Sequence, residues 1–248
     1  MLRHRVIPVV LLDGYSVVKT IEFDVRRNLG NPIAVARIYN TRNVDELILL
    51  DIGASKEDRH IDYFTIEDVA SECFMPLSVG GGLKSCAEIE KVLKKGADKV
   101  VLNTAALKSP QIIKDASSNF GSQCIVVSVD VIVQDDTYTV FSHAGVKFEQ
   151  DVVSWCRQIE DLGAGELFLN SVNNDGKMRG YDIKLVKTVS AALSIPVIAC
   201  GGASKPSDCA DVIKAGASAA AAASIFHFTH YTPQQCREAM HEAGIPVR

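Results

Sequence analysis

Short apolar runs alternate along the whole chain with stretches in which apolar positions recur at helical spacing. Because these runs are apolar on both faces and are separated by helical stretches, they predict the strands of a parallel sheet. Two of the predicted helices, Ala87–Lys95 and Asp151–Leu162, are each followed by a glycine, which is a typical helix stop. The predicted strands are Val6–Leu11, Leu47–Asp51, Leu77–Val79, Val100–Leu102, Cys124–Asp130, Leu167–Asn170, Val197–Ala199 and Ala219–Ala222.

The chain also contains an internal repeat. The segment Pro76–Gly82 returns 120 residues later as Pro196–Gly202, and other short matches follow at the same shift. Four predicted strand–helix units in each half favour an α/β fold of the closed (β/α)8 TIM barrel type, with an internal two-fold half-barrel repeat. No linker separates the halves. We therefore expect one domain over residues 1–248, with half-barrels of about residues 1–121 and 122–248.

Composition narrows the classes of partner. The chain has 248 residues, a net charge of −4 and 47% hydrophobic residues, which favours neither a nucleic-acid nor a membrane partner. The basic start lacks the long apolar region of a signal peptide, and no stretch is apolar enough for a spanning helix. The seven scattered cysteines form no C-x-x-C pair, so we expect a reduced, cytoplasmic compartment, no metal site and no cofactor.

Mostly small or polar residues follow the predicted strands, where a TIM barrel gathers its chemistry. Two glycine pairs stand out, because exposed backbone N–H groups followed by a helix N-terminus bind a phosphate dianion. The alternative is that the glycines only make tight turns, but their recurrence at matching places favours an elongated ligand with a phosphate at each end. The two cradles are Gly81 and Gly82 with Asn103 and Thr104, and Gly201 and Gly202 with Ala223 and Ser224.

Several short segments match the motifs of one known family, namely Arg5–Pro8, Leu50–Ser55, Val79–Gly82, Gly96–Lys99, Asn103–Ala105, Phe120–Val127, Asp175–Gly176, Gly180–Asp182 and Ala222–Phe228. Through them essentially the whole chain resembles the cyclase subunit of imidazole glycerol phosphate synthase. The resemblance implies a class I glutaminase partner whose ammonia passes through the barrel and attacks a bisphosphorylated ribulosyl substrate. It also implies two catalytic aspartates that end the first and fifth strands, as general acid and base.

One of these two aspartates is missing. Asp130 matches the aspartate of the fifth strand, but the position on the first strand is Leu11. Asp13 lies two residues further on and could take over the role only from a displaced position. Asn170, Asn173 and Ala144 also depart from the family pattern, and the loop at Lys19 lacks its usual glycine. The resemblance still implies ligand contacts from the two cradles and from Lys19, Asp51, Asp175 and Gly176.

The opposite end of the barrel retains the residues that the resemblance places there. Arg5, Glu46, Lys99 and Glu166 match the charged ring at the N-terminal face through which ammonia enters, and Asp98 matches a residue of the glutaminase interface. A ring of this kind could also only neutralise itself across the barrel floor. Burying four charges is nevertheless costly unless they serve a purpose.

Three hypotheses remain open at this point. The favoured one is a barrel that passes ammonia to an acceptor without the standard cyclisation, as similar paralogs do in making acetamidino sugars of lipopolysaccharide O-antigen with a separate sugar amidotransferase. The second is a true cyclase of histidine biosynthesis, and the third is a non-catalytic scaffold that activates the glutaminase. All three include a glutaminase at the N-terminal face and no metal or cofactor. A phosphorylated sugar or ribotide ligand is expected in the first two, and in the first the phosphate cradles are inherited or used for regulation.

Overall fold

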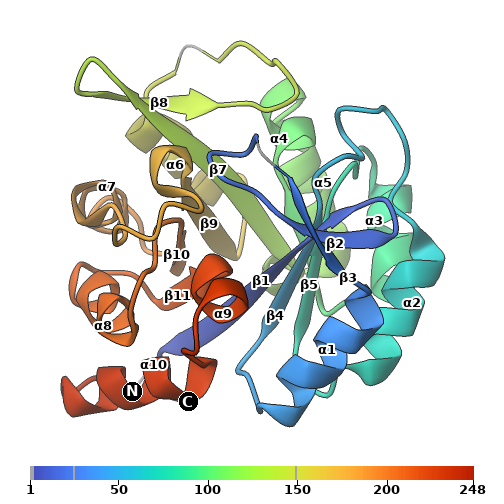
Figure 1. The fold of residues 1–248 in the computed structure, drawn as a ribbon. Coiled ribbons are helices and arrows are strands. Elements are labelled where there is room, and N and C mark those ends of the chain that lie inside the picture. Colours follow the sequence, from blue (N-terminus) through green and yellow to red (C-terminus); the bar gives the residue numbers. More distant parts are fainter. Residues whose placement is uncertain (1–2, 25, 149) are drawn as a thin grey trace.

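Parallel strands close into a barrel in the computed structural model, which describes residues 3–24, 26–148 and 150–248 (Figure 1). Within these residues eight strands pair in the order β1, β4, β5, β6, β7, β9, β10 and β11, and β11 pairs with β1 to complete the ring. The predicted (β/α)8 TIM barrel is therefore confirmed. The strands are β1 Arg5–Asp13, β4 Leu47–Asp51, β5 Leu77–Gly80, β6 Lys99–Leu102, β7 Ile125–Gln134, β9 Glu166–Ser171, β10 Val197–Cys200 and β11 Ala219–Ala222.

All eight predicted strands are present, but two of them run on into hairpins that the sequence did not predict. β1 turns back into β2 (Ser16–Lys19), which pairs with β3 (Arg27–Gly30), and β7 turns back into β8 (Thr137–Phe141). The β7–β8 turn has positive φ at Asp135 and Asp136, as tight hairpin turns require. The two hairpins grow from the matching strands of the two half-barrels, at the mouth of the barrel.

Helices surround the barrel and are fixed by side-chain caps at several N-termini. Asn31 caps α1, Ser85 caps α3 and Asp151 caps α6, each by accepting backbone N–H bonds from the first turn. His4 lies beside the C-terminal residues that follow α10, because its N–H donates to Pro246 O and its carbonyl oxygen accepts from Arg248 N (Figure 1). The helices are α1 Pro32–Thr41, α2 Tyr63–Glu72, α3 Cys86–Lys94, α4 Thr104–Lys108, α5 Gln111–Phe120, η1 Ser122–Cys124, α6 Val152–Asp161, η2 Val172–Asn174, α7 Ile183–Ser190, α8 Pro206–Lys214, α9 Ser224–Phe228 and α10 Pro233–Glu242.

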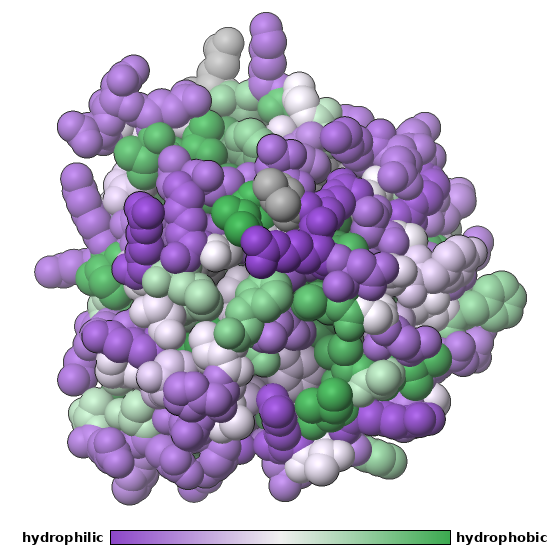
Figure 2. All heavy atoms as spheres, viewed as in Figure 1, coloured by the Kyte–Doolittle hydropathy of each residue, from purple (hydrophilic) through white to green (hydrophobic). Residues whose placement is uncertain are grey.

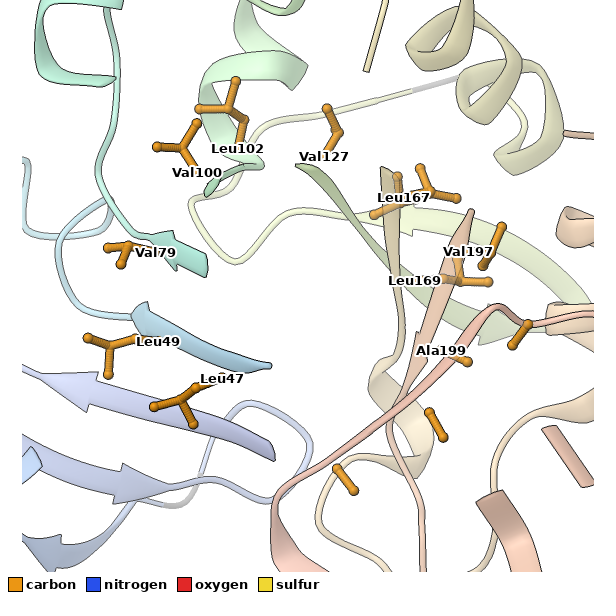
Figure 3. Packing of buried hydrophobic residues seen from close by; sticks show 14 of the residues in the cluster. Leu47, Leu49, Val79, Val100, Leu102, Val127, Leu167, Leu169, Val197 and Ala199 are labelled. Carbon is orange, nitrogen blue, oxygen red and sulfur yellow. The ribbon is translucent and has the colours of Figure 1, made fainter. Parts of the chain in front are cut away.

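The core has two layers because successive strand residues point to opposite faces. One layer lies between the strands and the helices, and Figure 3 shows residues such as Leu47, Leu49 and Val197 pointing away from the barrel centre. The other fills the barrel interior and includes Ile48 and Phe168. The strand residues whose side chains point to the barrel interior can therefore contribute to a site at the mouth.

The outer surface is mixed in character. On the face drawn in Figure 2, hydrophobic side chains show in small groups among hydrophilic ones. Among the residues that the structure describes, no helix is both long and apolar enough to cross a membrane.

Candidate functional site

A pocket opens at the C-terminal ends of the barrel strands, where the sequence predicted the site. It reaches down to Val9, Val101 and Phe168 of the barrel interior. Phe23 and His143, from the loops beyond the two hairpins, also line it. Most of the predicted site residues meet here, namely Leu11, Lys19, Asp51, Gly81, Gly82, Asn103, Thr104, Asp130, Asn170, Asp175, Gly176, Gly201, Gly202, Ala223 and Ser224.

Asp130 lies buried in the pocket wall within reach of three hydrogen-bond donors. Asn103 Nδ2 donates to Oδ2 at 2.7 Å, Asn170 Nδ2 donates to Oδ1 at 2.7 Å, and Ser128 Oγ donates to Oδ1 at 3.3 Å. Burial raises the pKa of Asp130 to about 6, although these hydrogen bonds oppose the rise. A carboxyl group that titrates near neutral pH can both accept and return a proton, which general acid–base chemistry requires.

Leu11 occupies the corresponding place on the other side of the barrel. It points inward with Ile7 and Val9 and is 9% exposed. Its strand β1 is four positions from β7 in either direction around the ring, so Leu11 and Asp130 stand on opposite walls. The wall that faces Asp130 therefore presents methyl groups at this position, and no proton can be exchanged there.

Asp13 does not reach the pocket. It is the last residue of β1 and lies two residues beyond Leu11, about 6–7 Å further along the strand. Its carboxylate forms an ion pair with Arg26 and lies against Gly53. Asp13 is not among the described residues that line the pocket. The geometry therefore opposes the alternative in which Asp13 replaces the missing acid or base.

Lys19, which is buried, and Asp175, which is partly buried, form an ion pair in the pocket wall. Lys19 Nζ donates to Asp175 Oδ1 at 2.9 Å, and Thr20 Oγ1 donates to Asp175 Oδ2 at 2.8 Å. Gly176 packs so closely on Thr20 that a Cβ atom added to it would lie 2.5 Å from the Thr20 carbonyl oxygen. These contacts join the end of β2 to the loop after η2.

The other strand-end carboxylate, Asp51, is neutralised by Arg59. Arg59 Nη1 donates to Asp51 Oδ2 at 2.6 Å and Nη2 donates to Oδ1 at 2.8 Å. The backbone N–H groups of Gly53 and Ala54 also donate to Oδ1, each at 3.1 Å. Arg59 was missed in the sequence because it lies in a loop without periodic pattern. Its position only eight residues after the strand-end acid was the one available signal.

The two glycine cradles share one packing arrangement. A Cβ atom on Gly81 would lie 2.4 Å from the Asp51 carbonyl oxygen, and one on Gly201 would lie 2.5 Å from that of Ser171. Both glycines have φ in the left-handed region, at +122° and +98°. The repeat seen in the sequence is thus repeated in three dimensions.

Ser224 marks the second cradle as a place where a polar group is needed. Its Oγ is buried in the pocket wall and has no hydrogen-bond partner within the described part of the chain. Buried hydroxyls in proteins are nearly always satisfied. Since this hydroxyl belongs to a residue that lines the pocket, a bound ligand oxygen would supply the partner.

The N-terminal ends of the strands carry a closed ring of charges. Arg5 donates to Glu46 Oε2 at 2.5 Å and to Glu166 Oε2 at 3.1 Å. Lys99 Nζ lies 3.1 Å from Glu46 Oε2 and 3.0 Å from Glu166 Oε1, so each cation bridges both carboxylates. Ser78 Oγ adds a donor to Glu46 at 2.7 Å. The predicted residues therefore come together across the barrel floor, with balanced charge.

Asp98 and Asn173 are the remaining sequence candidates. Asp98 is exposed beside the ring, and its Oδ2 accepts from Leu77 N at 2.8 Å. Asn173 does not line the pocket in the described structure. Its Oδ1 accepts instead from Val133 N at 2.7 Å, next to the turn of the β7–β8 hairpin.

Comparison with known proteins gives concordant matches. A model of the family described as histidine biosynthesis protein matches residues 5–232. The full chain is 47% identical to 99% of a Campylobacter jejuni protein named, provisionally, imidazole glycerol phosphate synthase subunit hisF2. It is also 42% identical to imidazole glycerol phosphate synthase subunit HisF of Petrotoga mobilis and to the subunit of the same name from Thermococcus onnurineus. Both matches cover 100% of this chain, with 100% of the Petrotoga mobilis protein and 99% of the Thermococcus onnurineus protein.

Proposed function

This chain belongs to the histidine biosynthesis protein family, among the HisF subunits of imidazole glycerol phosphate synthase, and we propose that it is a barrel that passes ammonia from a glutaminase to an acceptor without the standard cyclisation. One observation carries the proposal. The charged ring at one end of the barrel is complete, whereas at the other end Leu11 faces Asp130.

The route for ammonia runs along the barrel axis. It starts at the ring of Arg5, Glu46, Lys99 and Glu166, where the glutaminase docks in this proposal. Above the ring the interior is apolar, with residues such as Ile48. Transfer of a charged ammonium ion through such a layer is far more costly than transfer of neutral ammonia. The interior therefore favours delivery of the nucleophilic, uncharged form to the pocket.

Asp130 is the group in position to handle the proton of the amination step. When ammonia attacks a carbonyl carbon of the acceptor, the C–N bond forms as the C=O π bond breaks, which leaves a positive charge on nitrogen and a negative charge on oxygen. A nearby group must take a proton from the nitrogen and return one to the oxygen. The raised pKa of Asp130 suits this transfer near neutral pH. Cyclisation needs a second group that moves a proton on the opposite face of the ligand, and Leu11 cannot serve there.

The acceptor in this proposal is a phosphorylated sugar or ribotide. The two glycine cradles, the unpartnered hydroxyl of Ser224 and the Lys19–Asp175 pair support it, because together they offer an anion site and polar contacts along the pocket. The proposed setting is cytoplasmic synthesis of an acetamidino sugar of lipopolysaccharide O-antigen, with a separate sugar amidotransferase. A non-catalytic scaffold would have no need for an unsatisfied hydroxyl in its pocket.

A second candidate function is the genuine cyclase reaction in histidine biosynthesis. The retained cradles and the poised Asp130 favour it, as does the identity to the HisF subunits. Loss of one of two acid–base groups lowers a rate by about 10²–10⁴, so a slow cyclase is compatible with Leu11.

Cyclase activity with ammonium salt separates the two functions. The purified chain is given the bisphosphorylated ribulosyl substrate and excess ammonium salt, which bypasses the glutaminase, beside Leu11→Asp. Leu11→Asn is the matched control, because it has the same size and polarity without the carboxyl group. We expect no turnover by the unaltered chain or by Leu11→Asn, and turnover by Leu11→Asp. Clear turnover by the unaltered chain would make it a cyclase and refute the proposal.

A further inference from the structure

Phe74 is the most exposed large hydrophobic side chain among the described residues, at 88%. It lies in the short segment between α2 and β5. Its backbone is held in place, since its N–H donates to Asn40 Oδ1 at 3.2 Å. An exposed aromatic ring on a fixed backbone is the form that protein–protein interfaces use for aromatic anchors.

The segment that carries Phe74 is part of the face with the charged ring. Pro76 O accepts from Leu47 N at 2.9 Å, directly after Glu46. Leu77 N donates to Asp98 Oδ2 at 2.8 Å, directly before Lys99. The backbone that presents Phe74 is therefore bonded to residues adjacent to two members of the ring.

The internal repeat provides a comparison within the same molecule. At the 120-residue shift the counterpart of Phe74 is Ser194, in the loop before β10. Ser194 Oγ and N both donate to Glu160 Oε1 of α6, the N–H bond at 2.8 Å. The second-half loop is thus polar and tied to its own helix. Only in the first half does this loop project an exposed aromatic ring, so the packing of the barrel does not require one.

We propose that Phe74 is the apolar anchor on which the glutaminase partner docks, off-centre over the first-half side of the charged ring. The inference rests on the proposed function, since it takes the glutaminase as the occupant of this face. The partner then offers an apolar pocket for the ring of Phe74 while its outlet lies over Glu46 and Lys99. Truncating an aromatic anchor usually costs an interface much of its affinity, while similar exposed residues outside the interface contribute nothing.

Binding of a purified class I glutaminase subunit from the same genome tests the anchor. The dissociation constant is measured for the unaltered chain, for Phe74→Ala and for Phe74→Ser, which copies the second-half loop. Phe64→Ala is the matched control, because Phe64 is 76% exposed on the first turn of α2, the helix that leads into Phe74. We expect both Phe74 variants to bind about 30-fold more weakly or worse, and the control to bind normally.

The outcomes are distinguishable. Normal binding by both Phe74 variants overturns the anchor and leaves the proposed function standing. Failure of the unaltered chain to bind the glutaminase overturns the proposed function and the anchor together. If the unaltered chain is instead a dimer in solution that Phe74→Ala converts to a monomer, with glutaminase binding unchanged, the face is a self-association surface and the anchor is refuted. Because Phe74 is surface-exposed, unchanged circular dichroism and melting temperature confirm that the variants fold.

Discussion

Leu11 and Asp130 face each other across the barrel mouth from strands that lie four positions apart in either direction around the ring. Each continues the inward-facing row of its strand, above Val9 on β1 and Ser128 on β7. The two-fold repeat therefore supplies equivalent positions, and only one of them carries a group that can move a proton. The effects of this asymmetry on stability and on ligand binding can be measured separately.

Asp130→Asn is expected to stabilise the fold at neutral and alkaline pH. The pKa of Asp130 is raised from 3.8 to about 6 in the folded chain, so the folded state binds the proton more tightly than the unfolded state. This contribution favours folding below about pH 4 and is lost as pH rises through about 6. Above pH 7 the ionised carboxylate then costs about 3 kcal/mol, which the neutral amide avoids.

The measurement is the free energy of unfolding in urea between pH 4 and pH 8. Asn103 or Asn170 can turn its amide to accept from the new side chain, so the variant keeps its hydrogen bonds. Asp135→Asn, in the exposed β7–β8 turn, removes a carboxylate without touching the pocket. A stability difference for Asp130→Asn that does not grow between pH 4 and pH 8 would contradict the raised pKa.

Glu46→Gln is expected to destabilise the protein strongly, whatever the ring does for ammonia. Glu46 is 1% exposed and accepts from Arg5, Lys99 and Ser78. Without the Glu46 charge, Arg5 and Lys99 share the single carboxylate of Glu166, and an excess positive charge in a largely buried ion network costs about 3–5 kcal/mol. Urea denaturation measures the loss.

The control for the ring is an exposed pair of the same chemistry. Glu90 pairs with Lys94 one turn further along α3, and both side chains are at least half exposed. Glu90→Gln is expected to cost only about 0.3–0.5 kcal/mol. Equal losses for the two variants would show that the ring is solvated and that its charges are not held by one another.

The barrel and the place of the pocket could be predicted from the sequence, because both follow from local pattern. Apolar runs identify strands, and parallel strands gather their ends at one mouth. The Asp51–Arg59 and Asp13–Arg26 pairs could not be predicted, since each partner lies in a loop whose path only the folded chain defines. The hairpin strand β3 was missed for a related reason: its sequence, Arg27–Gly30, is largely polar and exposed.

Gly81→Ala is expected to destabilise the protein by about 2–5 kcal/mol. An alanine at its φ of +122° is strained by about 1–2 kcal/mol, and its Cβ would lie 2.4 Å from the Asp51 carbonyl oxygen, which adds overpacking of about 1–3 kcal/mol. Gly145→Ala separates the two effects, because Gly145 has φ of +74° with nothing within 4 Å of the added atom. If both variants lose the same stability in thermal denaturation, the close packing at Gly81 is relieved by movement of the loop.

Ser224→Ala is expected to raise the stability of the ligand-free protein and to weaken phosphate binding. The variant removes a buried hydroxyl without a partner in the described structure, which should stabilise the fold by about 1 kcal/mol. With phosphate bound, the same change removes a hydrogen bond to a charged group, worth about 1.5–3 kcal/mol, so affinity should fall by about 10- to 100-fold.

The matched control is Ser190→Ala, because Ser190 Oγ is also buried without a described partner but packs against Gly216, away from the pocket. Melting temperature is followed against the concentration of inorganic phosphate and of a sugar bisphosphate. Both variants should gain stability without ligand, but only Ser224→Ala should lose the ligand-dependent rise. An unchanged rise in Ser224→Ala would mean that the hydroxyl does not contact the phosphate. Gly201→Ala should also lose the ligand-dependent rise in melting temperature. Its added Cβ atom would lie 2.5 Å from the Ser171 carbonyl oxygen and disturb the packing of the cradle to which Ser224 belongs.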